Sequence, residues 1–535
     1  MAQAAPEFIW VDDDLRMEHH GAAALGCFCP TCLGVFGRRT RRSWSREELV
    51  AALNDPAGQQ TREAWIGHNH QTLASLLEQI AEAVGEVDPK IRTGLMTIPP
   101  SYMVYSTRDG AGLLRSLGAT MIRPGAGFYT DDRPFEMYPK ALDMGRQMVG
   151  IPAEVADRQY ELEDFPYLTL KKSVATHVAE STLALAVGHN GIAFNVLGFR
   201  HGSRLEEFGP LMAGLRAARP FWQALVRQAG NLPLVGLWPA WNWEMMAKRP
   251  VTADRPWLTP WGKRYDLAAP CGLAEIGLPL AVEPSLVSIL HGQIAEVFSD
   301  EELLRMLSGA VLMDRPSLEV LWARGLGELT GVKIARTVTN GVKETLCADP
   351  LNGAGEGTDR FAYIEHMGSA CGPAAVLEPR AQGVRVLAVM RTFFNDAYGP
   401  CMTAFENRQG GRVVVGTYAP WAYLGTAAKR EQLLNVADWL ARGQLPVRVG
   451  PPCRMVPLAR LSPDRRWGVI VLLNAGSDPL ADVELDLRVP ADVPLRLIHP
   501  GRRRPLRLEA KPAAGGLEVL LHNIAPWAVQ AILVG

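Results

Sequence analysis

The sequence predicts an α/β protein whose last part is all β. Two observations indicate this. Short apolar runs alternate with amphipathic helical segments to about residue 450, and from about residue 452 only strand-like runs joined by turns remain. Strands that alternate with helices are typical of parallel sheets, whereas closely spaced short strands are typical of a β-sandwich. A chain of 535 residues is long enough for about two to four domains.

The first alternating pattern extends to about residue 235. Five apolar runs in it have strand character, and they begin near residues 8, 91, 121, 158 and 191. Helical periodicity lies between them, at 45–53, 61–85, 107–118, 135–150 and 173–190. We therefore expect parallel strands with crossover helices. The stretch that follows, at 236–269, is rich in Trp and Pro, and we expect it to be a linker or cap.

A second alternating pattern occupies residues 270–450. Runs such as VSILHG and GRVVVGTY alternate with helical segments such as SDEELLRML, which indicates a separate, doubly wound domain. Residues 451–535 contain runs such as WGVIVLLNAG and LEVLLHNI, which predict the β-sandwich. The expected parts are therefore 1–235, 236–269, 270–450 and 451–535.

Composition narrows the classes of function. The chain is 48% hydrophobic and 21% charged, with a net charge of −1, so it offers no basic face for a nucleic acid. Eight cysteines in so long a chain do not suggest a disulfide framework. Neither a signal peptide nor an apolar run long enough to cross a membrane is evident. We expect a cytoplasmic protein that acts on neither nucleic acid nor membranes.

Acidic residues gather at the ends of two predicted strands. Asp12, Asp13 and Asp14 follow the first strand, and Glu161, Glu163 and Asp164 end the fourth. Cleavage of a glycosidic bond requires two carboxyl groups, and in a barrel of parallel strands such groups lie at the C-terminal strand ends. A strand-end acid can also simply cap a helix or a loop. Two clusters at two strand ends favour the catalytic interpretation.

Three cysteines follow the first acidic cluster. Cys27, Cys29 and Cys32 form a Cys-x-Cys-x-x-Cys motif, whose thiolates suit tetrahedral zinc. A fourth ligand is needed, and His19, His20 or a distant cysteine are candidates. The alternative is a set of buried free thiols. A site so rich in sulfur would be structural and would hold the loop beside the first strand end.

These motifs, in this order, resemble glycoside hydrolase family 42, the β-galactosidases with a catalytic barrel, a trimerisation domain and a small C-terminal β domain. The cysteine loop, with Phe36, has the spacing of the family's zinc loop after the fourth barrel strand. WVDDDL precedes it, and the resemblance places the acid/base on Asp14 and the neighbouring Asn of the family on Asp13. LEDFP resembles the family's nucleophile segment and places the nucleophile on Glu163. Because Asp14 is one methylene shorter than Glu, Asp13 and Glu18 stay open as the acid/base.

The resemblance implies retaining hydrolysis of β-linked sugars, as in a β-galactosidase. Glu163 would attack the anomeric carbon, and Asp14 would protonate the leaving oxygen and then deprotonate water. The substrate would be a glycoside or an oligo- or polysaccharide. Three of the candidates have a simpler alternative: a surface ion pair for Arg16, a loop cap for Tyr129 and a packed domain junction for Trp241. The expected substrate-binding residues are Asp13, Arg16, Glu161, Tyr129 and Trp241.

The same alignment makes the five predicted strands barrel strands four to eight. Five strands cannot close an eight-stranded barrel, so the expected fold is α/β with an incomplete (β/α)8 (TIM) barrel. A flavodoxin- or glutamine-amidotransferase-like domain would follow, as the interface of a homotrimer, and then the small β-sandwich. A non-catalytic carbohydrate-binding or scaffold protein is the second class of function. A zinc-dependent hydrolase is the third, and a loop of cysteines alone argues against it.

Overall fold

The computed structural model describes residues 1–17, 26–168, 170–198, 204–258, 268–338, 342–362, 374–417, 419–422 and 424–535. The chain divides into two compact units. The first comprises Met1–Lys172, Val187–Leu205 and Trp241–Asp266, and the second comprises Ser173–Ala186, Glu206–Ala240 and Leu267–Gly535. The four-part division expected from the sequence stays a prediction.

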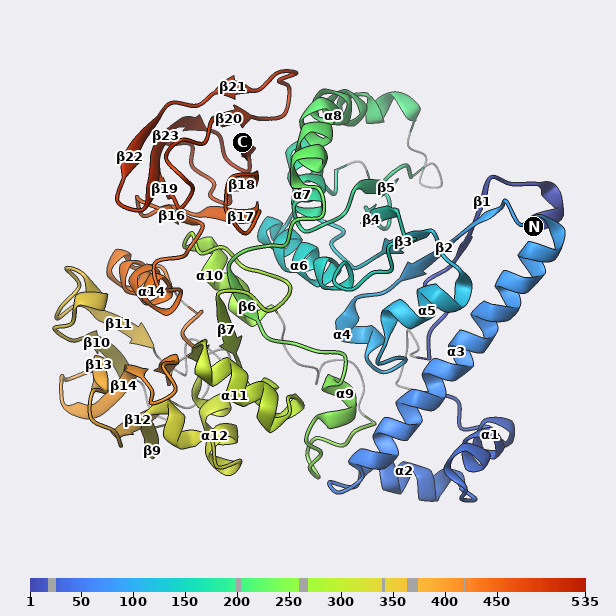
Figure 1. The fold of residues 1–535 in the computed structure, drawn as a ribbon, viewed down its shortest axis with the longest axis horizontal. Helices are drawn as coiled ribbons and strands as arrows, with labels where there is room; N and C mark the ends of the chain where they lie inside the picture. The colour runs from blue at the N-terminus through green and yellow to red at the C-terminus, as the bar shows by residue number, and fades with distance from the viewer. Residues whose placement is uncertain are drawn as a thin grey trace. The chain divides into compact units, whose positions relative to one another are not determined.

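The first unit is built on a parallel sheet of five strands. The strands lie side by side in chain order, and each is parallel to the next (Figure 1). This confirms the predicted strands and their direction. In the described part of the chain, the first and the last strand each have a single neighbour, so the sheet is an open half-barrel. The strands are β1 (Phe8–Val11), β2 (Arg92–Thr97), β3 (Met121–Pro124), β4 (Asp157–Glu163) and β5 (Gly191–Asn195).

Helices cover one face of this sheet. A core of Leu73, Leu77, Leu95, Leu113 and Ile122 joins α3 and α5 to β2 and β3. The apolar residues of α3 recur at helical spacing and so lie on one side, which is the reason this long segment is held against the sheet. The helices predicted at 45–53, 61–85, 107–118 and 135–150 are present, whereas those at Pro30–Thr40 and Pro100–Met103 were not predicted. The helices of this unit are α1 (Pro30–Thr40), α2 (Arg46–Asn54), α3 (Gln59–Val87), α4 (Pro100–Met103), α5 (Gly110–Leu117), α6 (Met137–Gln147) and α9 (Met245–Lys248).

The second unit contains a mixed sheet of eight strands. Its order is β11-β10-β13-β14-β15-β8-β7-β6, and only the last four strands are parallel to one another. The prediction of a doubly wound, parallel sheet is therefore wrong for β11, β10, β13 and β14, which pair antiparallel with their neighbours. The strands are β6 (Leu237–Pro239), β7 (Val287–Leu290), β8 (Ala310–Met313), β10 (Val342–Leu346), β11 (Asp359–Ala362), β13 (Arg385–Thr392), β14 (Ala397–Glu406) and β15 (Arg412–Gly416).

Two further details differ from expectation. The stretch predicted as a linker provides β6, an edge strand of the mixed sheet. The sequence also predicts a strand in the apolar run LPLAVE at 278–283, but this run forms no strand and contributes an isolated bridge between Leu280 and Leu237. A separate antiparallel pair consists of β9 (Val332–Val338) and β12 (Ala374–Pro379). The helices of the second unit are α7 (Val174–Ala186), α8 (Gly209–Ala229), α10 (Gly272–Glu275), α11 (Asp300–Ser308), α12 (Arg315–Ala323) and α14 (Ala427–Leu440).

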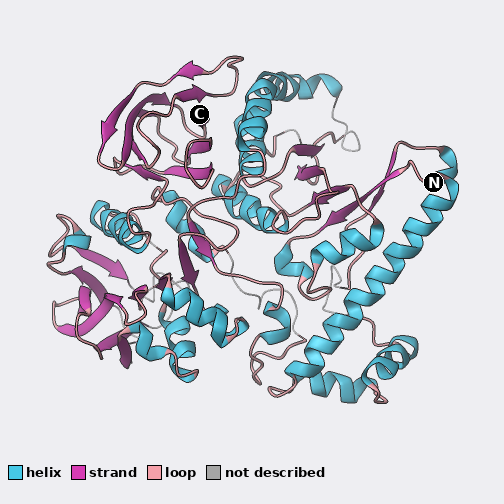
Figure 2. Cartoon of the chain, in the orientation of Figure 1, coloured by secondary structure: helices cyan, strands magenta, loops and turns pink. Residues whose placement is uncertain are grey.

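The end of the chain forms two antiparallel sheets, as the sequence predicts. Their orders are β16-β19-β23-β22 and β17-β18-β24-β20-β21, and Figure 2 shows this part in strands alone. Buried Leu485 and Val519 of one sheet share a core with Ile470 and Ile532 of the other, which makes the module a sandwich. The strands are β16 (Val447–Val449), β17 (Met455–Leu461), β18 (Gly468–Asn474), β19 (Leu480–Leu487), β20 (Leu495–Ile498), β21 (Leu506–Arg507), β22 (Ala510–Ala513), β23 (Gly516–Ile524) and β24 (Val529–Val534).

No helix among the described residues is both long and apolar enough to cross a membrane.

Candidate active site

The two acidic clusters lie at the C-terminal ends of two strands of the five-stranded sheet. Asp12, Asp13 and Asp14 directly follow β1, while Glu161 and Glu163 belong to the last residues of β4. All strands of this sheet run parallel, so their C-terminal ends lie on the same side of the sheet. Glu161 and Glu163 are two residues apart on one strand and therefore point to the same face of the sheet.

Glu163 is held by two hydrogen-bond donors. Its Oε1 accepts a hydrogen bond from the Tyr167 hydroxyl at 2.7 Å and one from Asn195 Nδ2, at the end of β5, at 3.1 Å. Lys172 Nζ donates to the Glu163 carbonyl at 3.1 Å and pairs with Asp164 at 3.0 Å. The side chain of Glu163 is thus oriented, and the backbone that carries it is anchored by a buried cation.

Glu161 is paired with Arg123 of β3. The guanidinium lies 2.8 Å from Glu161 Oε1, and both side chains are largely buried. Burial raises the pKa of Glu161, Arg123 opposes this, and the charges of Glu163 and Asp13 raise it further. Gly125 makes room for the pair, because a Cβ there would lie 2.0 Å from Glu161 Oε2.

The structure distinguishes the three acids after β1. Burial raises the pKa of Asp13, as do its hydrogen bond to Asp12 and the Asp12 charge. Burial also opposes the ionisation of Asp12, but hydrogen bonds from Asp13 and from the Asp14 amide keep the pKa of Asp12 below its usual value. The side chain of Asp14 is 72% exposed and accepts a hydrogen bond from Arg16 at 3.2 Å. Asp13 is therefore the member of the cluster whose environment favours a proton.

Tyr129 links the two clusters. It follows β3, and its ring packs edge-on against Phe165 with centroids 5.9 Å apart. Burial raises its pKa to about 12, with further contributions from Glu163, Glu161 and Asp13. The charges of carboxyl groups that follow β1 and that end β4 therefore both act on the Tyr129 hydroxyl.

Arg16 and Trp241, which were predicted to bind the substrate, have little exposed surface. Arg16 has a side chain only 10% exposed and pairs with Asp14 at 3.2 Å, and its expected role in substrate binding stays a prediction. Trp241 is 7% exposed and contacts Trp243 at 5.4 Å and Arg146 at 5.9 Å between group centres. It is part of a packed aromatic cluster and offers little ring surface. Glu18 lies outside the described residues.

Sequence reasoning did not anticipate Arg123, Tyr167, Lys172 or Asn195. Asn195 carries a usable signal, because it is a polar residue at the end of a predicted strand, like the acids of β1 and β4. Tyr167 and Lys172 lie in the irregular segment after β4, where no periodicity shows which way a side chain points.

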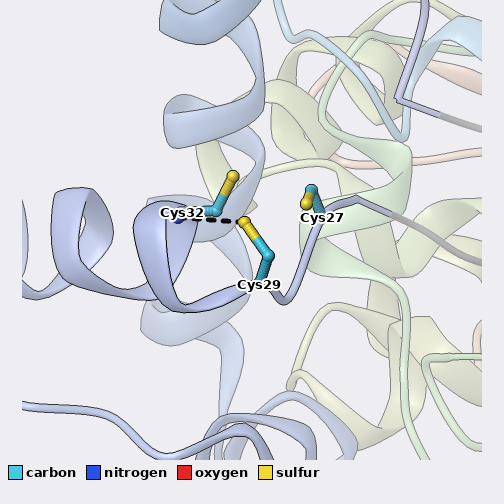
Figure 3. Close-up of side chains that lie close together, drawn as sticks. All are labelled: Cys27, Cys29 and Cys32. Atoms are coloured by element: carbon cyan, nitrogen blue, oxygen red, sulfur yellow. Dashed lines mark hydrogen bonds between the residues drawn. The ribbon is translucent and has the colours of Figure 1, made fainter.

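The three cysteines converge where α1 begins. Their sulfur atoms all lie within 4.8 Å of one another, and Figure 3 shows the three side chains close together at the start of the helix. Cys29 is the N-cap of α1, and its sulfur accepts the Cys32 amide at 3.5 Å. Hydrogen bonds from the Cys32 amide and from the thiols of Cys27 and Cys32 lower the pKa of Cys29 to about 7, whereas burial raises that of Cys32 to about 12.

This arrangement fits a metal ion. In a tetrahedral zinc site the Zn–S bonds imply sulfur atoms about 3.8 Å apart, so only a small contraction is needed. A bound cation would stabilise the thiolate forms of these cysteines. Among the described residues the cluster supplies three ligand atoms. His19 and His20, named above as candidates for the fourth, lie outside the described residues.

The fold is that of known glycosidases. No protein-family model and no curated protein matches the sequence. Solved structures match over nearly the whole chain. α-L-Fucosidase isoenzyme 2 from Paenibacillus thiaminolyticus has a TM-score of 0.62 at 16% identity, covering 100% of this chain and 79% of its own.

Two β-galactosidases share the same architecture. The enzyme from Bacillus circulans sp. alkalophilus has a TM-score of 0.56 at 11% identity, covering 95% of this chain and 77% of its own. That from Rahnella sp. R3 has a TM-score of 0.57 at 13% identity, covering 94% of this chain and 77% of its own. The structural matches confirm the resemblance to family 42 at the level of the fold.

Proposed function

We propose that this protein is a retaining glycoside hydrolase that acts on β-linked sugars, with Glu163 as its nucleophile. The observation that supports this best is that carboxyl groups follow β1 and end β4, at the C-terminal ends of two strands of one parallel sheet. One of these groups, Glu163, is already oriented by Tyr167 and Asn195. A glycosidase requires such a pair, one carboxylate to attack and one acid to protonate the leaving oxygen.

In the first step Glu163 attacks the anomeric carbon while the bond to the leaving oxygen breaks. A neighbouring acid gives its proton to that oxygen. In the second step the neighbouring residue, now deprotonated, takes a proton from water. The water oxygen attacks the anomeric carbon and releases Glu163. Of the residues that the sequence proposed for the acid, Asp13 suits the role better than Asp14. Asp13 is half-buried and favours a proton, whereas Asp14 is exposed and paired with Arg16.

The other groups would bind and position the sugar. The Arg123 cation keeps Glu161 in place beside the nucleophile, where the Glu161 carboxyl can accept hydrogen bonds from sugar hydroxyls. Tyr129 keeps its proton at neutral pH, because its pKa is about 12, and can donate it in a hydrogen bond. The three cysteines would hold a structural zinc ion that fixes the segment after β1 and does not take part in the reaction.

One observation favours the alternative of a non-catalytic carbohydrate-binding protein. In the described part of the chain, β1 and β5 are both edge strands, whereas the closed barrels of this class have no edge. An open sheet leaves one side of the polar cluster without strands to enclose the sugar. Such a protein would bind a sugar without hydrolysing it.

The decisive experiment compares Glu163→Gln with Glu154→Gln, an exposed acid of the same unit. Hydrolysis of p-nitrophenyl glycosides of β-galactose, related β-sugars and α-L-fucose is measured, together with binding of the free sugars. We expect Glu163→Gln to lose about 10³-fold or more of the activity and Glu154→Gln to retain it. Binding that is equal in both variants, with no hydrolysis by the unmodified chain, would establish the non-catalytic alternative.

A further inference from the structure

Arginines gather on one surface of the second unit. The helix α8 contains three arginines and no acidic residue, and Arg216 and Arg219 are exposed on it. The segment 495–508, which forms β20, β21 and the turn between them, contains five arginines and no acidic residue. The two segments lie side by side (Figure 1), because the Gly501 amide in the turn donates to the Ala217 carbonyl of α8 at 3.2 Å.

Six of these arginines have no partner of opposite charge. Within the described part of the chain, none of the six takes part in an ion pair or a side-chain hydrogen bond. Other surface arginines of this unit do have a carboxylate partner, as Arg466 has Asp492. One of the six is half-buried and the others are exposed. We call the following side chains the arginine patch: Arg216, Arg219, Arg502, Arg503, Arg504 and Arg507.

The positive charges of the patch oppose one another. Arg507 of β21 lies directly opposite Arg496 of β20, and like charges in this position destabilise a pair of strands. Arg496 donates to the Gly535 backbone oxygen at 2.6 Å, which does not remove its charge. Three consecutive arginines in the turn add to the repulsion. Such an arrangement is unfavourable for the fold by itself, and a bound polyanion would relieve it.

The composition conceals this surface. The chain as a whole has a net charge of −1, and neither segment forms the patch alone. The patch exists only where α8 and the turn after β20 meet, and these segments are far apart in the sequence. A local excess of positive charge on a near-neutral protein attracts an anionic partner to that one surface.

We propose that the arginine patch binds an acidic polysaccharide, a sugar polymer that carries sulfate or carboxylate groups. The guanidinium group is always charged, and its planar fork matches the oxygens of both kinds of group. A single contact of this kind at an exposed surface is weak. A polymer engages several arginines at once, so the weak contacts reinforce one another.

A polysaccharide suits the patch better than a nucleic acid. Proteins that bind single-stranded nucleic acids place exposed aromatic rings between the charges. The aromatic residues of α8, Phe221 and Trp222, are buried, and the segment 495–508 contains no Phe, Tyr or Trp. The choice of a sugar polymer also rests on the proposed function, because the patch would then hold a polymeric substrate on the enzyme. The positive surface itself does not depend on that function.

Binding to the full chain is measured by calorimetry with polygalacturonate, dextran sulfate, neutral dextran and a short DNA duplex, compared per unit of charge. We expect the acidic polysaccharides to bind in about 50 mM salt and to lose about tenfold or more in affinity at about 200 mM. Neutral dextran should not bind. The tighter of the two acidic polymers identifies the preferred group, carboxylate or sulfate. No binding of either one, or tighter binding of the duplex, would overturn the proposal.

Two double variants locate the site. One removes two charges from the turn, Arg503→Gln with Arg504→Gln, and the other removes two from α8, Arg216→Gln with Arg219→Gln. The control, Arg305→Gln with Arg408→Gln, removes the same charge from exposed positions elsewhere in this unit. We expect each patch variant to lose about tenfold in affinity and the control to retain it.

Three results would refute the proposal in different ways. An equal loss in the control would show attraction by net charge alone. An unchanged affinity in the α8 variant would show that helix and turn do not form one surface. Because binding is scored without hydrolysis, an active glycosidase that binds neither acidic polymer would refute the patch alone. A chain that binds them through the patch but cleaves no glycoside would refute the proposed function and leave the patch in place.

Discussion

Glu344 of β10 neutralises two buried cations, and removing its charge should destabilise the second unit. Its carboxylate accepts hydrogen bonds from Arg360 Nε at 2.6 Å and from Lys429 Nζ at 2.9 Å. All three side chains are at most 4% exposed. Lys429 belongs to α14 and also donates to Gln432 at 2.6 Å. The network therefore holds α14 against the mixed sheet.

The size of the effect follows from this burial. Glu344→Gln keeps the shape of the side chain but leaves two cations without a counter-charge, and breaking a buried ion pair in this way costs about 3–5 kcal/mol. Glu378→Gln is the control, because Glu378 pairs with Arg380 where both side chains are about half exposed. An exposed pair of that kind contributes about 1 kcal/mol or less.

The stability that Glu344 contributes should decrease as the pH falls. Although burial disfavours its charge, Arg360 and Lys429 lower the pKa of Glu344 to about 2, from 4.5. A carboxyl group with a lowered pKa stabilises the fold above its unfolded pKa, and this contribution disappears as the pH falls from about 4.5 to 2. The difference in stability between the unmodified chain and Glu344→Gln should therefore be full at pH 7 and shrink in acid.

The assay is urea unfolding, supported by hydrogen exchange at the amides of α14. The exchange measurement is needed because a chain of two units does not have to unfold in one step. A Glu344→Gln loss below about 1 kcal/mol, equal to that of Glu378→Gln, would refute the reasoning. Adding Lys429→Met to Glu344→Gln removes one uncompensated cation, so the two losses should fall short of additive by about 0.5–3 kcal/mol. Strictly additive losses would show that Glu344 and Lys429 are not coupled.

Three further predictions concern the site. Asp12→Asn removes the negative neighbour that raises the pKa of Asp13, so the alkaline limb of the pH–activity profile, where Asp13 loses its proton, should move to lower pH. An unmoved limb would exclude Asp13 as the acid. Tyr167→Phe deletes a hydrogen bond to Glu163 and should lower kcat/KM by about 10- to 150-fold, because bonds to charged groups contribute about 1.5–3 kcal/mol. A fall below about threefold would show that Tyr167 does not orient the nucleophile. Cys32→Ser should lower the zinc content measured by mass spectrometry from one atom per chain toward none, and equal metal content in both proteins would contradict a zinc site.

Local patterns determined much of this protein from the sequence alone. The five strands of the first unit were placed correctly because apolar runs and helical periodicity are properties of neighbouring residues. The same holds for the cysteines, since a motif that spans six residues brings its own ligands together. Figure 3 shows that the three thiols are in fact close. The strand-end positions of Glu163 and of the Asp12–Asp14 cluster also follow from the pattern.

Only the tertiary structure decided which of these residues meet. Three adjacent acids have the same local pattern, yet the fold half-buries Asp13 and leaves Asp14 exposed. Tyr167 and Asn195 reach Glu163 from a loop and from another strand. The sequence pattern also could not predict strand direction in the mixed sheet, because an apolar run has the same periodicity in a parallel and in an antiparallel pair. The physical reason is common to all three cases: local periodicity fixes which face of an element is apolar, whereas pairing and burial depend on contacts between residues far apart in the chain.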